Sequence, residues 1–130
     1  MSFRTILTSA ALATLPLTAF ADSDESRALV LEALEATLLA GNADAVDQYF
    51  AEDYIQHNPD FPDGIEGQRA VVNFLANTPG FSAEYVRVIA DDDIVAIHAR
   101  YEGFGPTATI GFDVFRVEDG MIVEHWDNLI

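Results

Sequence analysis

The change of residue pattern at Phe81 is the feature that most constrains the fold of this 130-residue chain. Before it, apolar residues such as Val30, Leu34 and Leu38 recur at helical spacing. After it, β-branched and aromatic runs separated by turn residues predict strands at about 82–90, 94–102, 108–118 and 121–129. Helices first and consecutive antiparallel strands afterwards predict an α+β domain, with helices packed on one face of a curved sheet. Such a domain encloses a cone-shaped cavity that can hold a small molecule.

Three helices are expected before this point. Asp22 can cap the first helix, and Gly41 fits its C-terminal end. Asn42 can cap a second, short helix, and Pro79 ends a third. Between the second and third helices, residues 54–57 have the character of a short extended segment.

Residues 1–21 have the features of a secretory signal peptide. Arg4 supplies a positive start, an apolar stretch follows, and Ala19-Phe20-Ala21 resembles a cleavage site. The alternative is an amphipathic or buried N-terminal helix. We expect cleavage after Ala21, secretion to a bacterial periplasm, and a single mature domain over residues 22–130.

Charge and cysteine content exclude several classes of function. The net charge is −16, and all six cations are arginines, so nucleic acid and anionic membranes should repel the chain. There is no cysteine, which excludes thiol chemistry and cysteine metal sites. A histidine metal site would need His57, His98 and His125 to converge without any compact motif, so we expect no metal and no other cofactor.

The last hairpin decides which side chains face the cavity, and two registers are possible. A two-residue turn at Asp119-Gly120 would pair Asp113 with Trp126. A type I turn with Gly120 as a bulge residue would pair Asp113 with His125. We prefer the bulged form because it gives a mainly apolar cavity wall interrupted by an imidazole and two carboxylates.

In this register the inner and outer faces divide as follows. The inner face holds Asp113, Phe115, Val117, Val123, His125, Asp127 and Leu129. The outer face holds Val114, Arg116, Ile122, Glu124 and Trp126, with Arg116 and Glu124 near enough to pair. The apolar side chains of the outer face predict a homodimer through that face.

The remaining candidates come from other parts of the chain. His98 shares a strand face with Ile94, Ala96 and Arg100, although spacing alone does not say whether that face looks inward. His57 precedes Asn58-Pro59 at the expected cavity mouth. Tyr54 and Tyr101 could either bind a ligand or pack, and packing or a dimer contact is favoured over ligand stacking for Trp126.

Several blocks of the sequence together resemble a known family. They are Tyr54 to Pro59, Gly64, Asp93 to His98, and Asp113 to Asp127. The chain resembles the SnoaL-like polyketide cyclases of the nuclear-transport-factor-2-like superfamily over essentially all of residues 22–130. The resemblance implies a cone of three helices over a strongly bent antiparallel sheet, usually dimeric.

The same resemblance implies a chemistry. SnoaL-type cyclases close a ring by an intramolecular aldol reaction without metal or organic cofactor. Asp113 matches their acid/base aspartate by its place on the penultimate strand, and His98 matches a pocket histidine fifteen residues earlier. Ketosteroid isomerases, which have a similar fold, also carry a pocket carboxyl at the Asp113 position, and their last strand supports placing His125 and Asp127 inside.

Two functions therefore remain open. The first is a cofactor-independent lyase or isomerase that acts on a small carbonyl compound through an enolate, with Asp113, His98 and His125 as catalytic groups. Its substrate contacts would be His57, Asp127, Phe115, Tyr54 and Trp126. The second is a non-catalytic module that binds a small apolar molecule in the same cavity. A purely structural dimer or adaptor would instead have a cavity filled by side chains.

Overall fold

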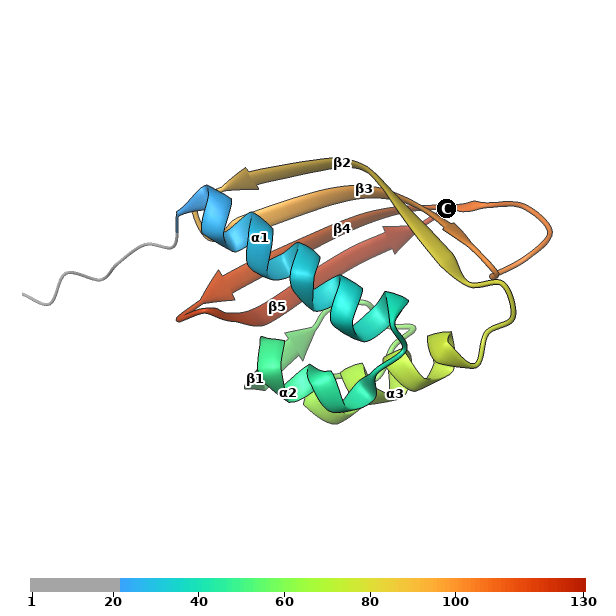
Figure 1. Cartoon of the computed structure of the whole chain (residues 1–130), viewed down its shortest axis with the longest axis horizontal. Helices are drawn as coiled ribbons and strands as arrows, with labels where there is room; N and C mark the ends of the chain where they lie inside the picture. The colour runs from blue at the N-terminus through green and yellow to red at the C-terminus, as the bar shows by residue number, and fades with distance from the viewer. Residues whose placement is uncertain (1–21) are drawn as a thin grey trace, which may run out of the picture.

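The computed structural model describes residues 22–130, so the predicted signal peptide lies outside the described residues and stays a prediction. Within the described part, no helix combines the length and the apolar character needed to cross a membrane. Figure 1 shows the helices on one side of a long sheet, as the sequence predicts.

The helices lie close to their predicted positions. They are α1 (Ser23–Leu34), α2 (Val46–Tyr49) and α3 (Gly64–Ala76). Glu35–Leu39 continues α1 as a π-helix, and Ala43–Ala45 is a short 3₁₀ turn before α2. Asp22 caps α1 by accepting a hydrogen bond from the Asp24 amide, and Gly41 has the positive φ of 65° expected after a helix end.

The strands also agree with the sequence prediction. They are β1 (Phe50–Gln56), β2 (Ser82–Asp91), β3 (Ile94–Glu102), β4 (Thr109–Glu118) and β5 (Met121–Leu129). They form one sheet in the order β1-β5-β4-β3-β2. The last four strands are consecutive and antiparallel. The short segment before α3 is a full strand, β1, and it pairs with β5 in the parallel sense.

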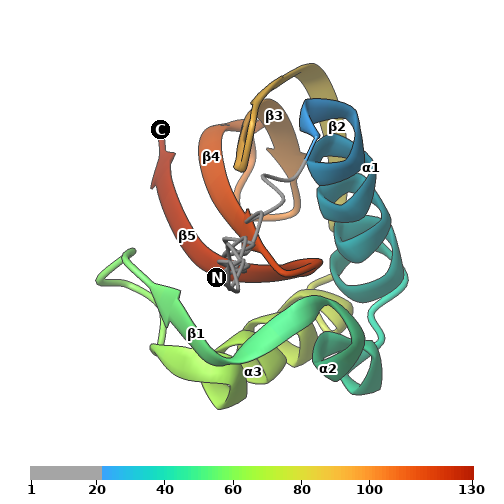
Figure 2. The same ribbon diagram turned by 90° about the vertical axis from the view of Figure 1, so that its left-hand side faces the viewer.

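The hydrophobic core lies between the helices and the concave face of the sheet. Figure 2 shows the strong bend of the sheet, with α1 on one side of the hollow and α3 closing it from below. From α1, Val30 and Ala33 are fully buried, and from β3, Val95, Ile97 and Ala99 alternate inward. The strand period of two therefore gives each strand a core face and an opposite, outer face.

The last hairpin adopts neither predicted register. Asp119 and Gly120 both have positive φ, 50° and 74°, and form a two-residue turn that pairs Val117 with Ile122. The ladder then shifts, so that Arg116 pairs with Glu124 and Val123 is the extra, bulged residue.

Because of this bulge, the predicted assignment of residues to the inner and outer faces is right for most of β4 and β5 and wrong next to the turn. Asp113 lies opposite Asp127, not opposite His125 or Trp126. The two-residue turn followed by a bulge nevertheless has the same parity as the preferred register, so Asp113, His125 and Asp127 do share the inner face. Ile122 is fully buried inside, contrary to the prediction that placed it outside and Val123 inside.

Candidate active site

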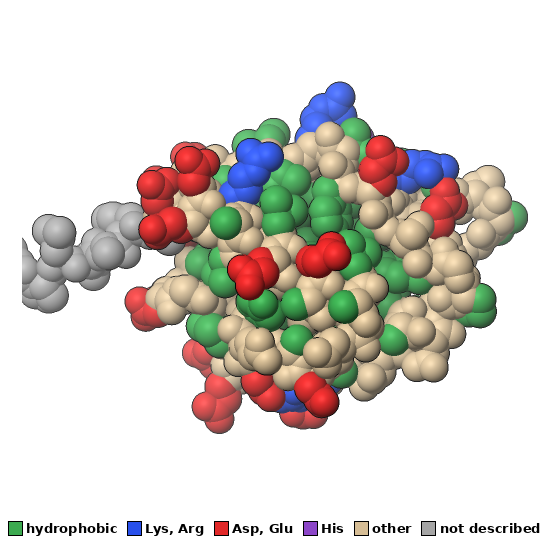
Figure 3. Space-filling model, viewed as in Figure 1, with side chains coloured by type: hydrophobic (Ala, Val, Ile, Leu, Met, Phe, Trp, Pro, Cys, Tyr) green, Lys and Arg blue, Asp and Glu red, His purple; other side chains and the backbone are tan. Residues whose placement is uncertain are grey.

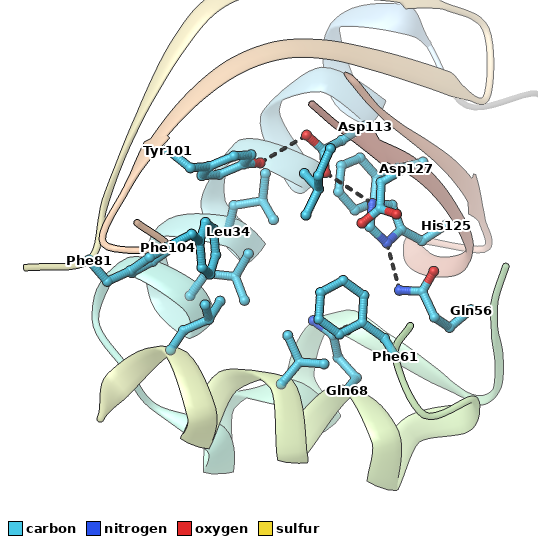
Figure 4. A pocket seen from close by; sticks show the side chains of 15 residues that line it. Leu34, Gln56, Phe61, Gln68, Phe81, Tyr101, Phe104, Asp113, His125 and Asp127 are labelled. Carbon is cyan, nitrogen blue, oxygen red and sulfur yellow. Dashed lines mark hydrogen bonds and ion pairs between the residues drawn. The ribbon is translucent and has the colours of Figure 1, made fainter. Parts of the chain in front are cut away.

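A cavity opens between the helices and the inner face of β3, β4 and β5 (Figure 4). Its volume is about 60 Å³. It is lined by Leu34, Leu38, Gln56, Phe61, Gln68, Val71, Leu75, Phe81, Tyr101, Phe104, Asp113, Phe115, His125, Asp127 and Leu129. The wall is thus mainly apolar, with its charged and hydrogen-bonding groups concentrated on the sheet.

The cavity continues into a wider outer groove of about 450 Å³. The two spaces share Phe61, Phe104, Asp127 and Leu129, and the groove adds Asn58, Pro59, Asp60, Phe74 and Asn128. Phe74 is 58% exposed at the groove, because the buried stripe of α3 consists of Gln68, Val72 and Leu75 instead. A ligand larger than the inner cavity would therefore extend over aromatic side chains.

Asp113 is the central polar group of the inner cavity. It is 7% exposed, and the Tyr101 hydroxyl donates a hydrogen bond to its Oδ2 at 2.8 Å. His125 Nε2 lies 3.3 Å from its Oδ1. Gly111 makes the first contact possible, because a Cβ at this position would lie 2.4 Å from the Tyr101 ring. Two donors therefore hold the Asp113 carboxylate in place at the end of an apolar space.

Asp127 brings a second carboxyl to the same wall, directly across the strand pair from Asp113. The Asn58 side-chain amide donates a hydrogen bond to its Oδ1. Burial raises the pKa of Asp127, and the negative charges of Asp113 and Asp60 raise it further, whereas His125 and Asn58 act in the opposite direction. The net effect raises the pKa of Asp127 above that of an ordinary aspartate, so its carboxyl takes up a proton more readily, beside an Asp113 that accepts hydrogen bonds.

The buried tyrosines keep their protons. Burial, with the nearby Asp113 carboxylate, strongly raises the pKa of Tyr101. Burial also strongly raises the pKa of Tyr54, with Asp127 adding to the effect. Tyr101 is consequently a hydroxyl donor at any physiological pH.

One group of three side chains has the residue types and the spacing of a metal site. The ligand atoms of Asp113, His125 and Asp127 all lie within 4.8 Å of one another. Both ring nitrogens of His125 already have hydrogen-bond partners, Asp113 at Nε2 and the Gln56 amide at Nδ1. The imidazole therefore has no free lone pair directed between the two carboxylates, and the residues fit a hydrogen-bonded network better than a metal site.

Four of the sequence-predicted site residues line the inner cavity: Asp113, Phe115, His125 and Asp127. The Phe115 ring stacks on the His125 imidazole, with centroids 4.3 Å apart and planes 7° from parallel. The parity of the last two strands thus brings these side chains together as predicted, although their catalytic or binding roles stay predictions.

His98 lies on the other side of the sheet, so the prediction that it converges with Asp113 is wrong. Its sequence neighbours Ile97 and Ala99 are 2% and 0% exposed and fill the core, which turns His98 outward. There its Nδ1 lies 3.1 Å from the Arg87 guanidinium, and its ring stacks on Phe112.

His57 and Trp126 are also on the outer face. Their rings stack at 4.8 Å, and His57 Nε2 contacts Glu124 Oε1 at 2.7 Å. Neither residue lines the cavity, so the predicted position of His57 at the cavity mouth is wrong. Tyr54 is buried in the core against Phe50 and does not line the cavity either.

Two site residues were missed from the sequence. Gln56 is 9% exposed and contacts His125 Nδ1 at 2.9 Å, and Asn58 contacts Asp127. Strand alternation starting from the apolar Tyr54 would have placed Gln56 and Asn58 inward and His57 outward.

Comparison with known proteins agrees with this architecture. The family model described as a SnoaL-like domain matches residues 30–125. The chain belongs to the SnoaL-like family. The matched range includes Gln56, Asp113 and His125, and it ends two residues before Asp127.

Solved structures of several other proteins share the fold. TsrD from Streptomyces laurentii is 23% identical, with a TM-score of 0.68 over 83% of this chain and 90% of that one. A proposed polyketide cyclase from Acidithiobacillus ferrooxidans is 19% identical, with a TM-score of 0.68 over 81% and 87%. A proposed ketosteroid isomerase from Kribbella flavida is 20% identical, with a TM-score of 0.69 over 86% and 82%. No curated protein matches the sequence. These identities establish the fold alone.

Proposed function

We propose that this SnoaL-like protein is an acid/base enzyme, a lyase or isomerase acting on a carbonyl compound. One observation carries the proposal: Asp113 lies in an apolar cavity, fixed by two donors, with a second carboxyl of raised pKa directly opposite. The membership of the SnoaL-like family, with cyclase- and isomerase-like proteins among its structural neighbours, supports a reaction of this type.

In the proposed reaction each carboxyl has a different task. Asp113 removes the proton from the carbon beside the carbonyl, and the electron pair of that C–H bond becomes the enolate. Asp127 donates its hydrogen to the carbonyl oxygen and stabilises the charge that develops there. In an isomerase, Asp113 returns the proton to another carbon. In a cyclase, the enolate carbon attacks a second carbonyl of the same molecule, and the proton goes to the new alkoxide.

The two spaces of the site constrain the ligand. The inner cavity of about 60 Å³ has room for only the reactive end of a molecule. The apolar body would lie in the outer groove against Phe61, Phe74 and Phe104. Among the described residues, no Lys or Arg lines either space, and Figure 3 shows acidic side chains spread over the viewed face, with basic ones mainly along its upper edge. An uncharged ligand therefore fits better than an anionic one.

The proposal is tested by substitution of Asp113 after a ligand screen. Thermal-shift measurements with small ketones, lactones and aromatic polyketide fragments would identify a ligand, and product analysis would follow turnover. We expect Asp113→Asn to lower kcat by about 10²–10⁴-fold with little change in ligand affinity. Asp53→Asn, on an exposed part of β1, is the charge-matched control and should behave as wild type. Unchanged turnover in Asp113→Asn would overturn the proposal.

A binding module is the second candidate, because the apolar cavity by itself is sufficient for binding. In that case a ligand would raise the melting temperature and be recovered unchanged after long incubation. Product formation that Asp113→Asn blocks would reject this candidate.

A further inference from the structure

We propose that Gln56 is a positioning residue that holds His125 as the neutral Nε2–H tautomer, so that the single ring N–H points at Asp113. The tautomer follows from the hydrogen-bond geometry alone. Its importance for turnover rests on the proposed function. Neither the sequence patterns nor the structural neighbours assign a role to Gln56.

The orientation of the Gln56 side chain is determined by a backbone group. The Asn58 backbone N–H donates to Gln56 Oε1 at 2.9 Å. A backbone N–H can only donate, so the amide atom that faces it must be the oxygen. The reversed amide would put two donors against each other. The NH₂ group of Gln56 must therefore face His125.

The orientation of this amide determines the protonation of the ring. Gln56 Nε2 lies 2.9 Å from His125 Nδ1, and an NH₂ group can only donate to it. Nδ1 must then be the unprotonated acceptor, and the ring proton is on Nε2, 3.3 Å from Asp113 Oδ1. The second amide hydrogen is also engaged, because Gln56 Nε2 lies 3.3 Å from the Tyr54 hydroxyl oxygen.

Burial and stacking prevent the ring from escaping this arrangement. The His125 side chain is 10% exposed, and Phe115 stacks against its face at 4.3 Å. Rotation of the ring would remove both nitrogens from their partners inside an apolar wall, which is costly. The four-residue chain from Asn58 through Gln56 and His125 to Asp113 is drawn in part by the dashed lines of Figure 4.

This arrangement has a consequence for catalysis. With Nδ1 covered by an amide, His125 does not compete with Asp113 for the substrate proton. Its N–H and the Tyr101 hydroxyl each occupy one oxygen of Asp113, which leaves the remaining lone pairs for the substrate. Gln56 thus acts on Asp113 through His125 and need not touch the substrate.

The test is the tautomer of His125, read from long-range ¹H–¹⁵N spectra of the ¹⁵N-labelled protein. We expect a pyridine-type Nδ1 and a pyrrole-type Nε2 in the wild type. His57→Gln and His98→Gln, both on the outer face, each remove one set of signals and so assign the third to His125. A pyrrole-type Nδ1 in the wild type would overturn the proposal.

Two substitutions of Gln56 test its role. Gln56→Leu removes the donor, and we expect His125 to become a mixture of tautomers. Gln56→Glu places an acceptor carboxylate against Nδ1, and we expect both ring nitrogens to carry protons at neutral pH. Gln68→Leu is the matched control, because Gln68 is a second buried glutamine on the cavity wall, and its loss should leave the His125 spectrum unchanged. A His125 spectrum unaltered in both Gln56 variants would also overturn the proposal.

Turnover gives an independent readout. If Gln56 positions the acid/base network, Gln56→Leu should lower kcat by at least about tenfold with KM little changed. If Gln56→Leu instead raised KM by a similar factor and left kcat unchanged, the positioning role would be contradicted. The spectra are readable whether or not any carbonyl compound is turned over, so failure of the tautomer assignment is distinguishable from failure of the proposed function.

Discussion

The two faces of β4 and β5 carry the same kinds of residue, but these residues are buried on one face and exposed or paired at the surface on the other. Phe115, Asp113 and His125 face inward, where the two polar side chains contact each other and the Phe115 ring stacks on the imidazole in a buried wall. Phe112 and Glu124 face outward, where side chains contact solvent or pair across the surface. The comparison shows that residue type does not identify the site. Strand parity does, because it decides which groups lose their water.

The largest expected difference concerns the two phenylalanines of β4. Phe115 is 3% exposed, whereas Phe112 is 49% exposed. We expect Phe115→Ala to lower the free energy of unfolding by about 3–5 kcal/mol, because it leaves a cavity in the core. Phe112→Ala should cost less than about 1 kcal/mol. Urea unfolding at low protein concentration measures both, and equal losses would break the distinction between the faces.

The histidines provide the next test. We expect His125→Gln to lower kcat by about 10²-fold, because it removes the imidazole donor to Asp113. His98→Gln changes the same residue type on the outer face and should turn over substrate like the wild type. Both rates would be measured on the ligand found in the thermal-shift screen. A strong loss in His98→Gln would restore the catalytic role that the family resemblance implied for it.

The outer face has its own proposed task. We propose that it joins two copies of the chain, because Phe112 and Ile89 are large apolar side chains exposed on that face, by 49% and 65%. Phe112→Asp should weaken the dimer by about tenfold or more, since a carboxylate would be buried at the contact. Phe104→Asp, at the rim of the cavity, should leave it intact. Sedimentation velocity measures the effect, and a wild type that is only monomeric at micromolar concentration would contradict the proposal.

The smallest expected effect is on stability and comes from Asp127. The pKa of Asp127 is higher in the folded state than in the unfolded state, so folding favours uptake of a proton. The free energy of unfolding therefore falls as the pH rises from the pKa of the unfolded state through the pKa of the folded state. Above that window the ionised, half-buried carboxylate is unfavourable. Asp127→Asn keeps the acceptor for Asn58 and should raise the melting temperature by less than about 4 °C at a pH above this window. The gain should shrink as the pH falls through the window, and thermal unfolding measured as a function of pH tests this.

The sequence predicted those parts of the fold that depend on local patterns. The four C-terminal strands were found because turn residues such as Asp119 and Gly120 separate them. The parallel pairing of β1 with β5 was not found, because it joins segments about seventy residues apart and leaves no local signal. Gln56 had a local signal in the alternation of β1, but its partner His125 lies on β5, so the contact between them had none.

The sequence predicted the inward-facing site residues correctly where a hairpin fixed which strand face points inward, and it failed where no such constraint existed. Asp113, His125 and Asp127 were placed correctly on the inner face because a hairpin links their strands. In β3 both faces carry apolar residues, Ala96 outside and Ile97 inside, so spacing could not orient His98. The bulge at Val123 has no sequence signal that would distinguish it from a bulge at Gly120.

That bulge makes the hairpin sensitive to register. Val123 is the extra residue, so His125 keeps its place opposite Phe115 only while Val123 stays outside the ladder. If Val123 instead paired with Arg116, the rest of β5 would slip by one residue, and Trp126 would face the cavity while His125 and Asp127 turned to the surface where subunits are proposed to meet. Deleting Val123 would remove this alternative, because the next residue of β5 would then pair with Arg116 as it does now. The same strand can therefore present either its reactive groups or its contact groups to the cavity, and the placement of one unpaired residue decides between them.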